Sequence, residues 1–169
     1  GQGWENSLTV GGAEADIPHS ITKEGTHHFI SAQVTHDANH LSISSGETIT
    51  STVGGKDILT LKVDGSANFM SQKIIGSLGD DFAGDLVRTS GYLAITGALG
   101  GEFVNDGETY GQNGHNNFLV AKVDQSGQEN DQYFTSSGSS SPEGRGNGIT
   151  ILDNGTLLIG GRLQPSTTY

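Results

Sequence analysis

The residues best suited to chemistry in this sequence are acidic side chains that follow short apolar segments. Asp80, Asp81 and Asp85 form the densest group, and Asp16 stands at the matching place 65 residues before Asp81. Calcium takes several oxygen ligands from carboxylates and loop carbonyls, so this group is a candidate Ca²⁺ site. An Asp that recurs at matching places also fits a structural role, in which its carboxylate accepts hydrogen bonds from turn amides. We favour the structural role and keep calcium as the alternative.

A second candidate site is the polar segment 100–116. Asp106 and Glu108 could contribute oxygens to a cation, and Tyr110 offers an aromatic ring to a ligand such as a sugar. His115 lies near the end of the same segment, where we expect a solvated histidine rather than a metal ligand. Tyr110 and His115 are therefore predicted to belong to a ligand-binding loop.

The other histidines do not predict a metal site. His36 and His40 are four residues apart, a spacing that suits metal ligands only on a helix, and their surroundings carry no clear helical pattern. His27 and His28 are adjacent, so their side chains point to opposite faces of a strand. We expect solvated loop histidines.

Motifs for catalysis or phosphate binding are absent from the sequence. It contains no Gly-x-Ser-x-Gly elbow, no Walker loop and no His-Glu-x-x-His. The Gly-rich segment 144–148, which includes Arg145, precedes an expected strand and not the helix whose N-terminal amides would bind an anion. We interpret this segment as a flexible connection.

The charge of the chain excludes several classes of partner. It has 19 acidic and 8 basic residues, for a formal net charge of −11. Neutralising phosphate needs clustered Lys and Arg, so we expect no nucleic acid and no anionic membrane surface as partner. The absence of cysteine excludes disulfides and thiolate metal sites. No apolar run is long enough to cross a bilayer, so we expect no membrane insertion.

The composition is typical of an all-β protein. Glycine accounts for 27 of the 169 residues and proline for only 3, with many Ser, Thr, Asn and Asp. These residues form turns. Apolar residues fall in short clusters such as 59–61 and 157–159, with no long stretch of helical periodicity. Many short strands separated by turns are the expected result.

An internal repeat divides these short strands into copies. The segment 21–25, an apolar stretch that ends in a turn glycine, matches 87–91 and 151–155. The segment 57–64 matches 117–124, which lies 60 residues later. Each complete copy predicts four antiparallel strands. The second strands are expected at 29–34, 92–99 and 156–163, and the fourth strands at 69–75 and 132–136.

Four short strands per copy are typical of a β-propeller blade, here enlarged beyond the usual ~40–45 residues by insertions. One small sheet cannot bury both of its faces, whereas blades around an axis cover one another. A closed propeller has roughly four to eight blades, so these two and a half blades are predicted to be part of a larger propeller or to close with other chains. The predicted boundaries are an outer strand and connection at 1–15, blades at 16–75 and 82–136, and half a blade at 144–163.

The repeat motif also resembles a known family. Its pattern is Gly-Gly-x-Asp, an apolar strand, Lys-Val-Asp, glycine, an aromatic residue and Asp-Asp, and residues 54–97 carry it best. This pattern is similar to the SBBP-type β-propeller repeat of exported bacterial proteins. The resemblance implies an extracellular or cell-surface location. The chain departs from the pattern in its long loops between second and third strands, and its first copy lacks the Asp-Asp pair.

The expected loops divide unequally between the two faces of a propeller. The tight turns lie on one face, and the other face carries the segments 35–56, 100–116, 11–15, 76–81 and 137–148. Function tends to reside in variable loops on a rigid scaffold. We therefore expect a non-catalytic structural or binding module of an exported bacterial surface or extracellular protein. Its long loops would serve adhesion or binding of a protein or glycan partner.

The alternative is the propeller domain of a secreted polysaccharide hydrolase or lyase. Such an enzyme needs carboxylates that converge on the substrate, at the axis where the first strands lie. The expected first strands supply mostly apolar residues, namely Ile17, Ile21, Leu86, Val87, Ile149 and Ile151. We therefore predict no catalytic residues, no certain cofactor, and Ca²⁺ as the candidate ion.

Overall fold

The computed structural model describes residues 7–12, 14–35, 41–43, 48–49, 54–89, 91–124, 131–135 and 143–164. These residues form antiparallel β-sheets joined by turns, so the all-β prediction is confirmed. Within the same ranges, no helix is long and apolar enough to cross a membrane. Trp4, His36 and His40 lie outside the described residues.

The first sheet holds the four strands predicted for the first blade. Its strands are β2 (Ile17–Glu24), β3 (His27–Thr35), β6 (Lys56–Val63) and β7 (Phe69–Ile75). Each pairs antiparallel with the next, in the order β2-β3-β6-β7. The prediction of a four-stranded antiparallel sheet is confirmed here.

The second sheet repeats this arrangement. Its strands are β8 (Phe82–Arg88), β9 (Tyr92–Leu99), β12 (Asn117–Asp124) and β13 (Gln132–Thr135). They pair antiparallel in chain order. A third, two-stranded sheet follows, made of β14 (Glu143–Ile151) and β15 (Leu157–Gln164).

The long segments between second and third strands contain short strands that the sequence analysis did not predict. In the first copy, β4 (Leu41–Ile43) pairs with β5 (Thr48–Ile49) and with β1 (Val10–Gly11). In the second copy, β10 (Phe103–Asn105) and β11 (Glu108–Tyr110) form a hairpin. Strands of two or three residues are too short to show the alternation from which a strand is predicted.

The same residue type closes the hairpin between first and second strands in all three copies. Gly25, Gly91 and Gly155 have φ angles of 57°, 100° and 83°. Glycine adopts positive φ without the steric cost that a Cβ would impose. The turn glycine of the repeat is therefore a conformational requirement.

A β-bulge recurs in the first strand of each copy. The strand registers shift at residues 18–20 of β2, 83–86 of β8 and 146–148 of β14. A bulge adds one residue to a strand and bends it. The three copies therefore share a local irregularity as well as their strand order.

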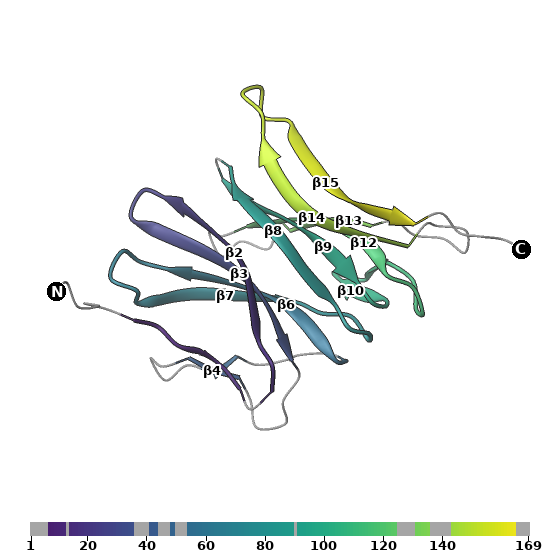
Figure 1. The fold of residues 1–169 in the computed structure, drawn as a ribbon, viewed down its shortest axis with the longest axis horizontal. Coiled ribbons are helices and arrows are strands. Elements are labelled where there is room, and N and C mark those ends of the chain that lie inside the picture. The colour runs from purple at the N-terminus through teal and green to yellow at the C-terminus, as the bar shows by residue number, and fades with distance from the viewer. Residues whose placement is uncertain are drawn as a thin grey trace, which may run out of the picture.

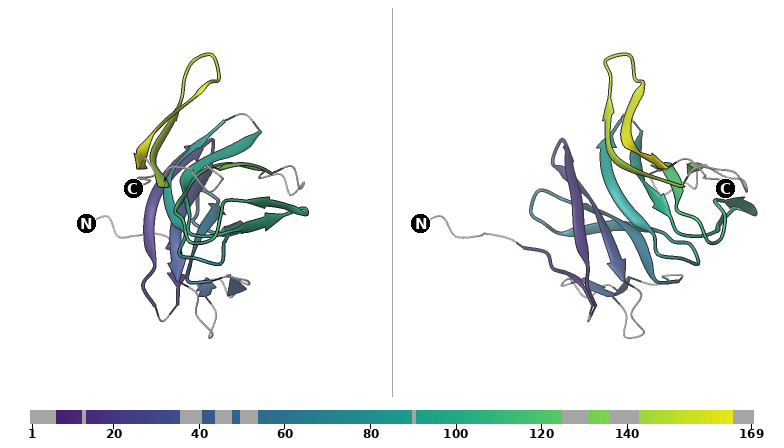
Figure 2. Two further views of the ribbon diagram at one scale, coloured as in Figure 1. Left: turned by 90° about the vertical axis from the view of Figure 1, so that its right-hand side faces the viewer. Right: turned by 45° about the vertical axis from the view of Figure 1, so that its right-hand side comes forward.

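The sheets pack on one another in chain order. Figure 1 shows the first sheet in purple and blue, the second in teal and green, and the β14–β15 hairpin in yellow. The right-hand view of Figure 2 shows the same order from a second direction. The first strands are neighbours, because β8 contacts both β2 and β14.

The main core lies between the first and second sheets. The first sheet contributes Phe29, Ile58 and Ile75, each at most 1% exposed. The second sheet contributes mainly Leu86, Leu93, Ile95, Leu99, Leu119, Ala121, Val123 and Tyr133. Burial of apolar surface at this interface provides about 25 cal/mol for each Å² removed from water, so the sheets stabilise each other.

The carboxylate of Asp81 holds the connection between the first and second sheets in place through hydrogen bonds. It is fully buried, and its carboxylate accepts hydrogen bonds from the backbone amides of Ser77 (2.5 Å) and Gly100 (2.9 Å). Burial raises the pKa of Asp81 above its usual value, although the hydrogen bonds from Ser77 and Gly100 act in the opposite direction. The carboxylate thus ties the connection to the end of β9.

Asp16 makes the same bonds one copy earlier. Its carboxylate accepts from the amides of Gly12 (2.9 Å) and Thr35 (3.1 Å). Both donors lie 65 residues before the donors of Asp81. The recurring aspartate is therefore a structural cap in both copies, as the sequence analysis favoured.

The two caps make a matched pair for mutation. We expect Asp81→Ala to lower the free energy of unfolding by about 2–4 kcal/mol, because buried donors lose their acceptor. We expect Asp16→Ala to cost about 1 kcal/mol, since water reaches its half-exposed donors. Urea denaturation followed by circular dichroism measures both.

Asp81→Asn keeps one acceptor oxygen and removes the buried charge, so its loss of stability is expected to lie below that of Asp81→Ala. Equal losses for Asp16→Ala and Asp81→Ala would contradict the role of burial.

Candidate functional site

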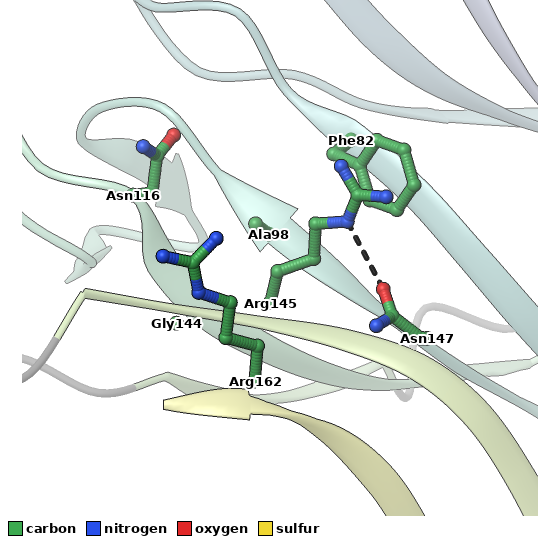
Figure 3. Close-up of a pocket in the computed structure, with 7 residues that line it drawn as sticks. All are labelled: Phe82, Ala98, Asn116, Gly144, Arg145, Asn147 and Arg162. Carbon is green, nitrogen blue, oxygen red and sulfur yellow. Dashed lines mark hydrogen bonds between the residues drawn. The ribbon is translucent and has the colours of Figure 1, made fainter. Parts of the chain in front are cut away.

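A polar pocket of about 450 Å³ lies between the second sheet and the β14–β15 hairpin. Figure 3 shows the residues that line it: Phe82, Ala98, Asn116, Gly144, Arg145, Asn147 and Arg162. Asn116 and Gly144 belong to the segments 100–116 and 137–148, which the sequence analysis assigned to the face with the long loops. The pocket therefore opens where function was expected.

Arg145 is held in a defined orientation. Its guanidinium lies 3.3 Å from the centre of the Phe82 ring, and its Nε donates a 3.0 Å hydrogen bond to Oδ1 of Asn147 (Figure 3). Cation–π contact of this kind favours a guanidinium stacked on the ring. Within the described residues, no carboxylate lies within ion-pair distance of Arg145. Its terminal amino groups therefore remain available at the pocket.

A second guanidinium reaches the same pocket from the neighbouring strand. Arg145 on β14 and Arg162 on β15 are direct cross-strand partners. Directly opposed side chains on antiparallel strands have Cβ atoms roughly 4.5–5.5 Å apart, and like charges there are destabilising. The hairpin thus places two arginines in the lining of one pocket, together with the amide side chains of Asn116 and Asn147.

The aromatic wall continues into the first sheet. The imidazole of His19 packs edge-on against Phe82, with ring centroids 4.8 Å apart. Burial lowers the pKa of His19, and the positive charge of Arg145 lowers it further. His19, Phe82 and Arg145 come from β2, β8 and β14, so the row of side chains crosses all three sheets.

Two of the three predicted calcium ligands near residue 81, Asp81 and Asp85, accept hydrogen bonds from protein groups. Asp80 is exposed and Asp81 is the buried cap described above. Asp85 accepts hydrogen bonds from the hydroxyl of Ser20 and from the amide of Ile149 (3.2 Å), and so links three first strands. Among the described residues, no group of three His, Asp or Glu side chains is placed to hold a metal ion.

The second predicted cation site falls on the β10–β11 hairpin. Asp106 and Glu108 are both exposed there, and Glu108 accepts a 2.8 Å hydrogen bond from the Tyr110 hydroxyl. That bond raises the pKa of Tyr110. The Tyr110 ring lies 5.3 Å from that of Tyr133 and packs against the core. The structure therefore brings Asp106, Glu108 and Tyr110 together, with one face of the tyrosine occupied by core residues.

His115 lies apart from this hairpin group. It is half-buried, and its carbonyl accepts a 3.0 Å hydrogen bond from the side chain of Asn117. The Asn117 amide also donates to the carbonyls of Leu99 (3.1 Å) and Gln112 (2.9 Å). The loop around His115 is thus fixed to the start of β12.

Sequence reasoning missed the arginine pocket. The expectation that 144–148 is a flexible connection was wrong, because this segment is paired along β14 with β15. Gly146 is required for packing, because a Cβ at this position would collide with the side chain of Thr96 in β9. The sequence shows Arg145 within this segment but gives no sign that it lies opposite Arg162.

The fold and site define an all-β protein of packed antiparallel sheets with a basic pocket between two of them. Comparison of the chain with protein-family models, with curated proteins and with solved structures finds no match.

His19 predicts a pH dependence of stability. Because its pKa is lowered in the folded state, the unfolded chain takes up the proton more readily. The free energy of unfolding should therefore fall as the pH drops below the ordinary histidine pKa of 6.5. His19→Gln should reduce this fall between pH 7 and pH 5, measured by urea denaturation. An unchanged fall in the variant would show that other groups cause it.

Proposed function

We propose that the chain is a non-catalytic binding module built of β-propeller blades, and that it belongs to an exported bacterial surface or extracellular protein. Each four-stranded sheet is a blade, and the β14–β15 hairpin is the first half of the next. The loop-bearing face with its arginine pocket binds the partner. The observation that carries this proposal is the partly open apolar face of the first sheet.

That face carries apolar residues at positions where the second sheet buries apolar residues, although Leu59 and Val63 are themselves buried in the first sheet. The matching positions are Ile30 and Ile95, Leu59 and Leu119, and Val63 and Val123. In the second sheet these side chains pack in the core shared with Phe29, Ile58 and Ile75. The repeat therefore supports a further sheet of the same kind in the corresponding place on the first sheet.

An apolar groove of about 620 Å³ runs along this face, lined by residues of β2, β3 and β6. Leu8 and Val10 cover part of it, but Ile21 remains 64% exposed. At the opposite end of the stack, Leu158 of β15 occupies the position that matches Phe29 and is 57% exposed. Open apolar faces at both ends support a stack that continues.

The middle of the first strands supports a non-catalytic role. Leu86 and Ile149 are buried in the packing between sheets. Asp85, the carboxylate beside them, accepts hydrogen bonds from Ser20 and Ile149. A glycan-cleaving site needs a pair of carboxylates about 5–10 Å apart that face the substrate, and Asp85 is instead committed to joining strands.

The two open faces predict association of the isolated chain. We expect its mass in solution, measured by light scattering after size-exclusion chromatography, to exceed the 17.5 kDa of one chain. Ile21→Asp should lower that mass, because a charge on the apolar face opposes docking. Val104→Asp is the control, since Val104 is 63% exposed on β10, away from this face. A mass of one chain at every concentration would contradict the proposal.

A non-catalytic module should leave polysaccharides intact. We expect no new reducing ends and no unsaturated products after incubation of the protein with acidic and neutral polysaccharides. Turnover of any of them would overturn this part of the proposal and favour a secreted hydrolase or lyase.

A further inference from the structure

The arginine pocket is a positive site in a strongly acidic protein. The chain has only 8 basic residues against 19 acidic ones, yet two of its arginines line one pocket. We infer that this pocket binds the carboxylate of a sugar acid, such as a uronic acid residue of an acidic glycan. The inference rests on the proposed function in that it names the ligand class of the same binding face.

Arg145 and Arg162 present two guanidinium groups to one pocket. They are direct partners across β14 and β15, so both side chains leave the hairpin on the same face. A carboxylate that contacts both groups makes two charge-assisted contacts, and the planar fork of Arg matches carboxylate geometry. The pair therefore favours a ligand that carries negative charge.

Arg145 is also oriented before any ligand arrives. The stacking on Phe82 and the hydrogen bond from Nε to Asn147 fix the plane of the guanidinium and leave its terminal amino groups free to donate (Figure 3). A group held in its binding orientation loses less side-chain entropy when the ligand binds.

The remaining lining favours a sugar over a simple inorganic anion. Asn116 and Asn147 line the pocket beside the arginines, and amide side chains both donate to and accept from hydroxyl groups. The pocket of about 450 Å³ lies within the range of small-molecule sites. Inorganic phosphate can accept from the guanidinium and amide N–H groups, whereas the hydroxyls of a uronic acid can also donate to the amide oxygens.

Isothermal titration of the protein with trigalacturonate tests the inference. The neutral counterpart, trigalactose, and inorganic phosphate are the comparison ligands. We expect saturable binding of trigalacturonate, weaker binding of phosphate, and no binding of the neutral sugar. Arg145→Gln and Arg162→Gln should each lower the affinity for trigalacturonate roughly tenfold, as expected for loss of a charge-assisted contact.

Lys23→Gln is the control variant. Lys23 is an exposed residue at the end of β2 and is not part of the pocket lining, so its removal changes the net charge by the same amount. Equal loss of affinity in Lys23→Gln would show that binding follows overall charge and would overturn the site. Phosphate binding as tight as trigalacturonate binding, or no binding of trigalacturonate at all, would overturn the ligand class.

The two proposals fail in different ways. Association that is sensitive to Ile21→Asp, with no binding of trigalacturonate, would refute the ligand while leaving the blade stack in place. Binding that is sensitive to Arg145→Gln, in a chain that stays monomeric, would refute the stack and support the pocket.

Discussion

The structure depends on the burial of sheet faces against other sheets. A four-stranded sheet of this size has apolar residues on both faces, and water at either face is unfavourable. The second sheet meets this constraint on one side with Phe29, Ile58 and Ile75 of the first sheet. On the other side it meets the β14–β15 hairpin, where Gly146 allows close approach to Thr96. Strand order, bulges and turn glycines all serve to present these faces.

Hydrogen bonds and ion pairs between polar groups fix the relative positions of the sheets, which apolar packing alone does not determine. Sheet faces would tolerate sliding, whereas hydrogen bonds fix one relative position. Asp81 ties the connection to β9, and Asp85 joins β2, β8 and β14 through Ser20 and the amide of Ile149. At the outer strands, Lys73 of β7 forms an ion pair with Asp131, the residue before β13. Asp81 and Asp85, which the sequence offered as candidate calcium ligands, thus accept hydrogen bonds that hold parts of the protein together.

The strands and their order could be predicted because their signals are local. A turn glycine such as Gly25 and the alternation in 117–124 lie within a few residues of the strand they define. The pocket could not be predicted, because it depends on register and on packing between sheets. Simple counting from the turn 152–156 would pair Arg145 with Leu163. The bulge beside Asn147 shifts the register by one, and so places Arg145 opposite Arg162.

The pocket arises where the third copy departs from the repeat. In the second copy the backbone N–H of Asp81 donates a hydrogen bond to the carbonyl of Lys56. The matching hydrogen bond of the third copy runs from the N–H of Gly144 to the carbonyl of Asn116. Glycine therefore stands where Asp81 fills the space, and Arg145 stands where Phe82 begins its strand. The third copy therefore lacks the carboxylate of the cap and carries a guanidinium at the next position. Both changes make the charge at this end of the strand more positive. In the second copy, Asp81 and Phe82 fill the space between two sheets. Among the described residues, the third copy alone has a pocket there, and its positive charge suits an anion.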